Sequence, residues 1–215
     1  MLFRSLKELV EAGGIAGDMT VGEMSSTSLD NCVRYANPAE KELKMVFSFH
    51  HLKVDYKDGQ KWALKAPDYA ELRSLFKTWQ EGMQAKDAWN ALFWCNHDQP
   101  RAVSRFGDDR NYWKESARSL AMLIHLMRGT PYIYQGEELG MTNAYFTDIS
   151  QYRDVESTNY FRILKEGGAS TEEALEIIAA RSRDNGRTPM QWDASEGAGF
   201  TTGTPWLGIP ANHVT

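Results

Sequence analysis

A carboxylate and an imidazole directly follow an apolar segment near the middle of the chain. Ala91–Cys95 shows no alternation with polar residues, which is typical of a strand buried on both faces of a parallel sheet. Pro100 has no backbone donor, so the strand ends at or just before His97 and Asp98. Side chains at the carboxyl ends of parallel strands commonly form active sites. The position is compatible with a chemical role for Asp98, and an Asp that only caps the next loop fits equally well.

A second carboxylate ends another predicted strand. Residues 18–23 have strand character and finish at Glu23. Taken alone, Glu23 fits a helix-capping or solvated loop carboxylate better than a catalytic group.

Basic side chains cluster after a third predicted strand, at residues 45–51. The cationic or imidazole side chains of this region are His50, His51, Lys53 and Lys61. Lys61 follows Lys53 across Asp58-Gly59, a turn signal that predicts a hairpin-like return. Such a cluster suits a dianionic phosphate, which cationic donors bind through charge-assisted hydrogen bonds. The alternative is an exposed basic loop balanced by Asp55 and Asp58.

The elements that must position these groups alternate between strand and helix. Strands are predicted at 18–23, 45–51, 89–95 and 131–135, and helices at 2–12, 68–86, 112–128 and 170 to about 183. Ser170 with Glu173 forms a capping box, and Gly129 with Pro131 closes the helix at 112–128. These are consecutive βα units, which form either a small open α/β sheet or part of a larger barrel.

Composition restricts the class of protein. The chain has 215 residues, 42% of them hydrophobic, and a net charge of -5 that disfavours nucleic acid and anionic membranes as partners. Cys32 and Cys95 match no metal-ligand spacing and suit a reducing cytoplasm. No apolar run approaches a membrane span, and residues 2–12 resemble an amphipathic helix more than a signal peptide. We therefore expect a cytoplasmic protein whose partner is neither nucleic acid nor a membrane.

Four motifs together resemble a known family of enzymes. They are Thr20-Val21-Gly22-Glu23-Met24, Asn96-His97-Asp98-Gln99-Pro100-Arg101, the segment 129–138 and the segment 182–192. In this order they are similar to signature regions of the α-amylase family, glycoside hydrolase family 13, and of its oligo-1,6-glucosidase branch. The resemblance covers nearly the whole chain.

The resemblance implies a fold and a role for each matching residue. The fold is a (β/α)8 TIM barrel, of which residues 1–215 would form the second half, strands five to eight and the following loop and helix region. The N-terminal half-barrel and the C-terminal β-domain of the family would lie outside the chain. Glu23 matches the general acid/base, Asp98 the transition-state stabiliser, and His97 a residue that binds sugar hydroxyls. Arg101 and Arg187 would bind substrate or hold loops in place.

The family's nucleophile has no counterpart in this sequence. Retaining hydrolysis needs a second carboxylate about 5 Å from the acid. In the family, this Asp lies in a Gly-x-Arg-x-Asp motif on the strand before the one that carries Glu23, and no such motif occurs here. We therefore expect a fragment of a catalytic domain that is inactive by itself.

One segment indicates the substrate within the branch. Phe49–Asp55 with Lys61-Trp62 resembles members that hydrolyse trehalose 6-phosphate to glucose and glucose 6-phosphate, and residues 24–28 agree. The partner expected is thus a small sugar phosphate, with no cofactor and no metal site among these residues. Calcium binding elsewhere in the barrel and the oligomeric state stay open. The alternatives are an oligo-1,6-glucosidase or dextran glucosidase, and a non-catalytic sugar-binding half-barrel or pseudoenzyme.

Overall fold

A computed structural model describes residues 19–210 of the chain, which form two compact units. The first unit contains the described segment up to Val54, together with Asp68–Leu92 and His125–Tyr132. The second contains Asp55–Pro67, Phe93–Ile124 and the segment from Ile133 onward. The helix predicted at 2–12 lies outside the described residues.

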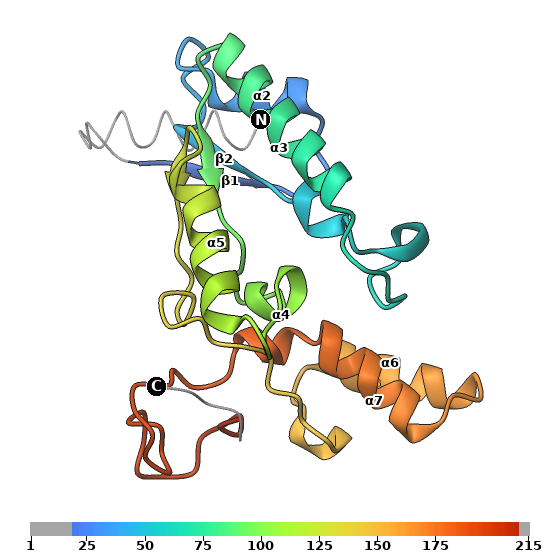
Figure 1. Ribbon diagram of the computed structural model, residues 1–215. Helices are drawn as coiled ribbons and strands as arrows, with labels where there is room; N and C mark the ends of the chain where they lie inside the picture. The colour runs from blue at the N-terminus through green and yellow to red at the C-terminus, as the bar shows by residue number, and fades with distance from the viewer. Residues whose placement is uncertain (1–18, 211–215) are drawn as a thin grey trace. The chain divides into compact units, whose positions relative to one another are not determined.

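The first unit is built on a four-stranded parallel sheet (Figure 1). Its strands, in spatial order, are β1 (Val21–Met24), β2 (Met45–Ser48), β3 (Asn90–Leu92) and β4 (Thr130–Pro131). Val46 of β2 lies opposite Gly22 on one side and Asn90 on the other. The parallel sheet predicted from the sequence is confirmed, but the strands are shorter than predicted. Apolar residues continue past the last ladder partner, as in the buried segment 93–95.

Among the described residues, two helices and one short turn of 3-10 helix accompany the sheet. α2 (Leu29–Ala36) packs against β2 and against α3 (Tyr69–Ala85), as Figure 1 shows. Asp68 caps α3 by accepting hydrogen bonds from two backbone N–H groups of its first turn, which confirms the predicted start of this helix. The prediction of a strand to residue 51 was wrong, since η1 (His50–Lys53) is a 3-10 turn.

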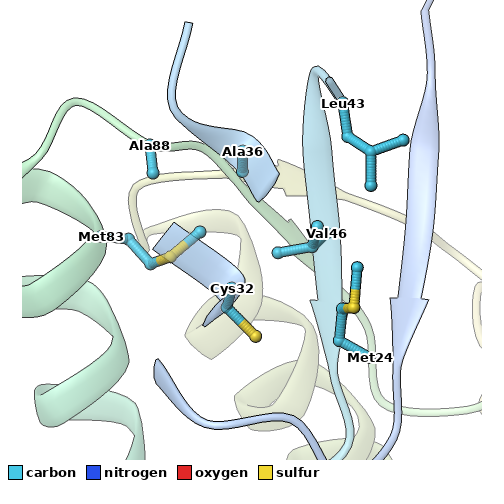
Figure 2. Packing of buried hydrophobic residues seen from close by; sticks show 7 residues of the cluster. All are labelled: Met24, Cys32, Ala36, Leu43, Val46, Met83 and Ala88. Carbon is cyan, nitrogen blue, oxygen red and sulfur yellow. The ribbon is translucent and has the colours of Figure 1, made fainter. Parts of the chain in front are cut away.

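A small hydrophobic core joins these elements. Figure 2 shows its seven buried side chains, which come from β1, β2, α2, α3 and the segments beside them: Met24, Cys32, Ala36, Leu43, Val46, Met83 and Ala88. Cys32 is fully buried, and burial raises the pKa of its thiol. This core fixes β1 and β2, and thereby the backbone on which Glu23 and the basic residues lie.

The second unit consists mainly of α-helices, short 3-10 turns and loops. Its helices are α4 (Ala102–Phe106), α5 (Trp113–His125, whose last residue falls in the first unit), α6 (Val155–Glu166) and α7 (Thr171–Arg181). Short 3-10 turns occur at η2 (Lys57–Gly59), η3 (Ile149–Gln151) and η4 (Arg183–Gly186). α6 and α7 lie side by side (Figure 1). The capping box at Ser170 and Glu173 is confirmed.

The C-terminal end of α5 differs from the prediction. α5 ends at His125, earlier than the predicted Arg128, whose backbone N–H instead donates to the side chain of Gln80.

The core of the second unit contains Trp62, Ala144, Phe146, Tyr152, Ile178 and Leu207. Within residues 19–210, no helix is both long and apolar enough to span a membrane.

Candidate active site

Asp98 lies in the turn that follows the buried segment 93–95, and an arginine holds it from one side. Nη2 of Arg187 donates to Oδ1 of Asp98 at 2.8 Å, and Nε of the same guanidinium donates to the His97 carbonyl at 2.7 Å. The Asp98 side chain nevertheless stays 44% exposed. A carboxylate fixed on one side and open on the other can meet a ligand in a defined orientation.

The backbone on either side of Asp98 is held equally closely. Asn96 Oδ1 accepts a hydrogen bond from the Asp98 N–H at 2.8 Å. Gly186 comes so close that a Cβ atom there would lie 2.7 Å from the carbonyl oxygen of Gln99 and 2.9 Å from that of Asn96. Only glycine fits this contact without movement, so the loop that carries Arg187 packs directly on the loop that carries Asp98.

Arg101 lies inside the second unit, with 1% of its surface exposed. Its Nε donates to the Asn185 carbonyl at 3.0 Å, and its Nη1 donates to the Gln135 carbonyl at 2.5 Å. Burial lowers the pKa of the guanidinium. Of the two roles considered for Arg101, this position matches the holding of loops, while contact with substrate stays a prediction.

A buried acid lies close to Arg101. Burial raises the pKa of the Glu137 carboxyl to about 8, against the opposing effects of a hydrogen bond with the Tyr134 backbone and of the Arg101 charge. Glu137 Oε1 is buried without a hydrogen-bond partner among the described residues. The loop after β4 therefore contains a carboxyl group that is largely neutral near pH 7.

The sequence analysis missed Arg183. This residue connects Asp98 with two acidic residues, Glu156 of α6 and Asp154, which is the N-cap of α6. Arg183 Nη2 donates to Asp154 Oδ1 at 2.6 Å, and its Nε lies 3.4 Å from Glu156 Oε2. Its Nη1 lies 3.6 Å from Asp98 Oδ1. Hydrogen bonding by Asp154 raises the pKa of the Arg183 guanidinium, which therefore stays charged. Arg183 lies within a motif, but no spacing in the sequence links it to residues near 155.

Lys61 belongs to the same network. Its Nζ donates to Glu156 Oε2 at 2.7 Å and lies 4.8 Å from the centre of the Trp62 ring. The predicted hairpin-like return is confirmed, because Asp58 and Gly59 have positive φ angles of 52° and 73° and an antiparallel bridge joins Tyr56 to Leu64. Lys61 thus has an acidic partner in this structure.

The first unit places Glu23 near the end of β1, where its side chain is exposed. Among residues 19–210, none forms a hydrogen bond or ion pair with this carboxylate. Lys53 reaches the turn that follows β1, since its Nζ donates to the Ser25 carbonyl at 3.3 Å and to Ser26 Oγ at 3.2 Å. Of the predicted basic residues, Lys53 therefore lies beside the segment that carries Glu23.

The two histidines of η1 differ in environment. His50 Nδ1 lies 3.1 Å from Ser48 Oγ, and burial together with the Lys53 charge lowers the pKa of its imidazole. His51 is buried, with its ring 5.5 Å from that of Phe76. The structure thus brings His97, Asp98 and Arg187 together in the second unit, and His50 and Lys53 near Glu23's strand in the first. Their roles toward a substrate stay predictions.

Comparison with known proteins identifies the family. The chain matches the alpha-amylase catalytic domain over residues 3–215, and it belongs to that family. This is a TIM-barrel family of glycoside hydrolases, and the four-stranded parallel sheet fits part of such a barrel. The resemblance inferred from the motifs is confirmed. Among the residues described, no group of three His, Cys, Asp or Glu side chains could hold a metal ion.

Two curated relatives that resemble this chain share one name. Trehalose-6-phosphate hydrolase from Bacillus subtilis (strain 168) is 62% identical over 195 residues, and that from Escherichia coli (strain K12) is 60% identical over 197 residues. These alignments cover 91% and 92% of this chain. The chain spans only 35% and 36% of the length of these relatives.

Two further comparisons give the same family. Glucan 1,6-alpha-glucosidase from Streptococcus pneumoniae is 47% identical over 216 residues, which covers 99% of this chain and 40% of that protein. The crystal structure of Bacillus licheniformis trehalose-6-phosphate hydrolase gives a TM-score of 0.93 at 57% identity, covering 98% of this chain and 38% of that one.

Proposed function

We propose that this chain supplies the acid/base and the stabilising carboxylate of a cytoplasmic α-glucosidase that hydrolyses trehalose 6-phosphate to glucose and glucose 6-phosphate. The observation that carries the proposal is a difference in identity. Two trehalose-6-phosphate hydrolases match the chain at 62% and 60%, whereas oligo-1,6-glucosidases match at 46–48% over the same length.

Each carboxylate has one task in the proposed retaining mechanism. Glu23 protonates the glycosidic oxygen as the leaving sugar departs, and then accepts a proton from the attacking water. Asp98, held by Arg187, stabilises the oxocarbenium-like transition state through the sugar hydroxyls. The nucleophile comes from barrel strands outside the 215 residues, with β1–β4 as strands five to eight, and the family's C-terminal β-domain also lies outside.

Among the basic residues, Lys53 is the best-supported ligand for the phosphate group. It is exposed, follows the carboxyl end of β2, and reaches the turn after β1. His50, His51 and Lys61 are the further phosphate ligands proposed, and His97, Arg101 and Arg187 the residues that contact or position the sugar.

A grafted enzyme tests this proposal. In it, the 215-residue chain replaces the matching segment of the Bacillus subtilis relative. Lys53→Ala is expected to lower kcat/KM for trehalose 6-phosphate by about tenfold or more, because a charge-assisted bond to the phosphate is lost. Activity on an unphosphorylated aryl α-glucoside should change little. Lys44→Ala is the matched control, since Lys44 is exposed just before the opposite end of β2. Equal losses on both substrates would remove the phosphate assignment.

A second candidate function is an oligo-1,6-glucosidase. The Lys61–Glu156 ion pair favours it, because this lysine already has an anionic partner. Under this alternative, the grafted enzyme hydrolyses isomaltose faster than trehalose 6-phosphate. The purified 215-residue chain itself is expected to hydrolyse neither, and turnover by the chain alone would contradict the assignment of the nucleophile to other strands.

A further inference from the structure

A buried carboxylate lies between two arginines in the second unit. Arg105 donates to Asp55 through both Nε and Nη2, each at 2.7 Å, in a bidentate pair. Arg181, the last residue of α7, donates through Nη1 to the Asp55 carboxylate and through Nη2 to its carbonyl at 2.6 Å. All three side chains are 3–5% exposed.

The group remains charged despite its burial. Burial alone would raise the pKa of Asp55, but hydrogen bonds and charges from Arg105 and then Arg181 lower it overall. Ion pairs in such surroundings contribute little stability compared with well-packed apolar residues, because desolvation offsets their attraction. Their retention here is therefore better explained by what they hold in place.

Arg105 also contacts the turn that carries Asp98. Its Nη1 donates to Gln99 Oε1 at 2.7 Å, and Gln99 directly follows Asp98. The Gln99 N–H in turn donates to the Asn96 carbonyl at 3.2 Å, within the turn that carries Asp98. Asp55 thus fixes the plane of the Arg105 guanidinium, and that plane fixes the side chain next to Asp98.

We propose that Asp55 is a positioning residue for Asp98, acting through Arg105 and Gln99. This inference rests on the proposed function, in which Asp98 stabilises the transition state. Arg181 serves as an internal comparison, because it shares Asp55 with Arg105, while no hydrogen bond joins it to Gln99 among the described contacts.

The matched substitutions Arg105→Lys and Arg181→Lys in the grafted enzyme test the proposal. Each lysine keeps a positive charge beside Asp55, but the single nitrogen of a lysine at position 105 cannot reproduce the planar guanidinium that pairs bidentately with Asp55 and bonds Gln99 at the same time. We expect Arg105→Lys to lower kcat on the aryl α-glucoside by about tenfold with little change in KM, since misplacement of a catalytic group acts on the chemical step. Arg181→Lys should lower the melting temperature similarly and leave kcat within about twofold.

A double-mutant cycle separates positioning from general destabilisation. Asp55→Asn and Gln99→Met are expected to lower kcat non-additively, so that the double variant loses no more than the poorer single variant. Additive losses would show that Asp55 does not act through Gln99, and would overturn the inference. So would equal kcat values for Arg105→Lys and Arg181→Lys.

Hydrogen exchange supplies a readout that does not require activity. The backbone amides of residues 96–99 should exchange faster in Arg105→Lys than in Arg181→Lys, measured by mass spectrometry. Equal exchange in the two variants overturns the inference. A grafted enzyme that hydrolyses neither substrate overturns the proposed function instead, and the exchange measurement then still decides whether Arg105 holds this loop.

Discussion

The two carboxylates expected to perform catalysis are held very differently. Asp98 accepts a hydrogen bond from Arg187, lies near Arg183, and sits in a turn fixed by Asn96. Glu23 projects from a well-anchored strand, yet no residue between 19 and 210 bonds to its carboxylate. The orientation of Asp98 is thus determined within its own unit, whereas none of the described residues holds the carboxylate of Glu23.

The largest expected effect separates the two carboxylates by their chemistry. In the grafted enzyme, Glu23→Gln should lower kcat/KM for trehalose 6-phosphate by about 10²–10⁴, because proton transfer to the leaving oxygen is lost. On 4-nitrophenyl α-glucoside the loss should be much smaller, since nitrophenolate departs without a proton. Steady-state kinetics on both substrates measure the difference.

Asp98→Asn is the matched control for that measurement. A stabiliser of the oxocarbenium-like transition state acts irrespective of the leaving group, so its kcat/KM should fall by a similar factor on both substrates. If the two variants respond to the leaving group alike, the assignment of distinct roles to Glu23 and Asp98 is wrong.

A smaller effect tests how firmly Asp98 is held. Arg187→Lys keeps the charge but loses one of the two bonds, to the His97 carbonyl or to Asp98. We expect kcat to fall about tenfold. Arg162→Lys is the control, because Arg162 forms an exposed pair with Glu166 at 2.7 Å on α6 and such pairs contribute little. Equal kcat in both variants would mean that Arg187 does not orient Asp98.

A pH effect is expected from the buried acid beside Arg101. The pKa of Glu137 is about 8 in the folded protein and about 4.3 in an unfolded chain, so the native state binds the proton more tightly. Its contribution to stability is therefore full below about pH 4 and is lost as the pH rises through 8. Glu137→Gln should gain on the order of 3–4 kcal/mol relative to wild type between pH 5 and pH 8.

Thermal melting at several pH values measures this gain. Glu138→Gln removes a carboxylate from the same loop and serves as the control. A stability difference between Glu137→Gln and wild type that stays constant from pH 5 to pH 8 would contradict the raised pKa.

The smallest expected effect concerns Glu156, which forms an ion pair with Lys61. Glu156→Gln removes the anionic partner of Lys61 and frees its ammonium group for a phosphate. We expect kcat/KM for trehalose 6-phosphate to rise about two- to fivefold, the size of a partly exposed ion pair. The aryl glucoside should be unaffected. A decrease on the phosphorylated substrate would indicate that Glu156 helps to hold Lys61 in its binding position.

Local signals in the sequence predicted a large part of the fold. The capping box at Ser170 and the helix start at residue 68 depend on neighbouring residues in the chain, and both predictions are confirmed. α6 was not predicted, because its buried side is nearly absent: Ser157 is its buried residue, while Val155 and Ile163 are 68% and 50% exposed. Such a helix has no apolar stripe to detect. α2 escaped prediction for a different reason, because only eight residues form it.

The site was predictable where a motif carried it and not where contacts between distant segments did. Glu23 and Asp98 came from motif resemblance, and the parallel strands that carry their backbone are confirmed. The contacts of Arg183 with Asp154 join residues 29 apart, and those of Arg187 with Asp98 join residues 89 apart. No periodicity encodes such pairs, since they depend on how loops are packed together.

The buried cysteines have a practical consequence for studies of unfolding. Cys32 lies in the first unit and Cys95 in the second, and burial raises the pKa of the Cys95 thiol to about 12. Because the thiolate is the reactive form, neither residue should be alkylated while its unit is folded. Pulsed iodoacetamide labelling followed by peptide mass mapping would therefore time the opening of each unit separately, with no engineered probe.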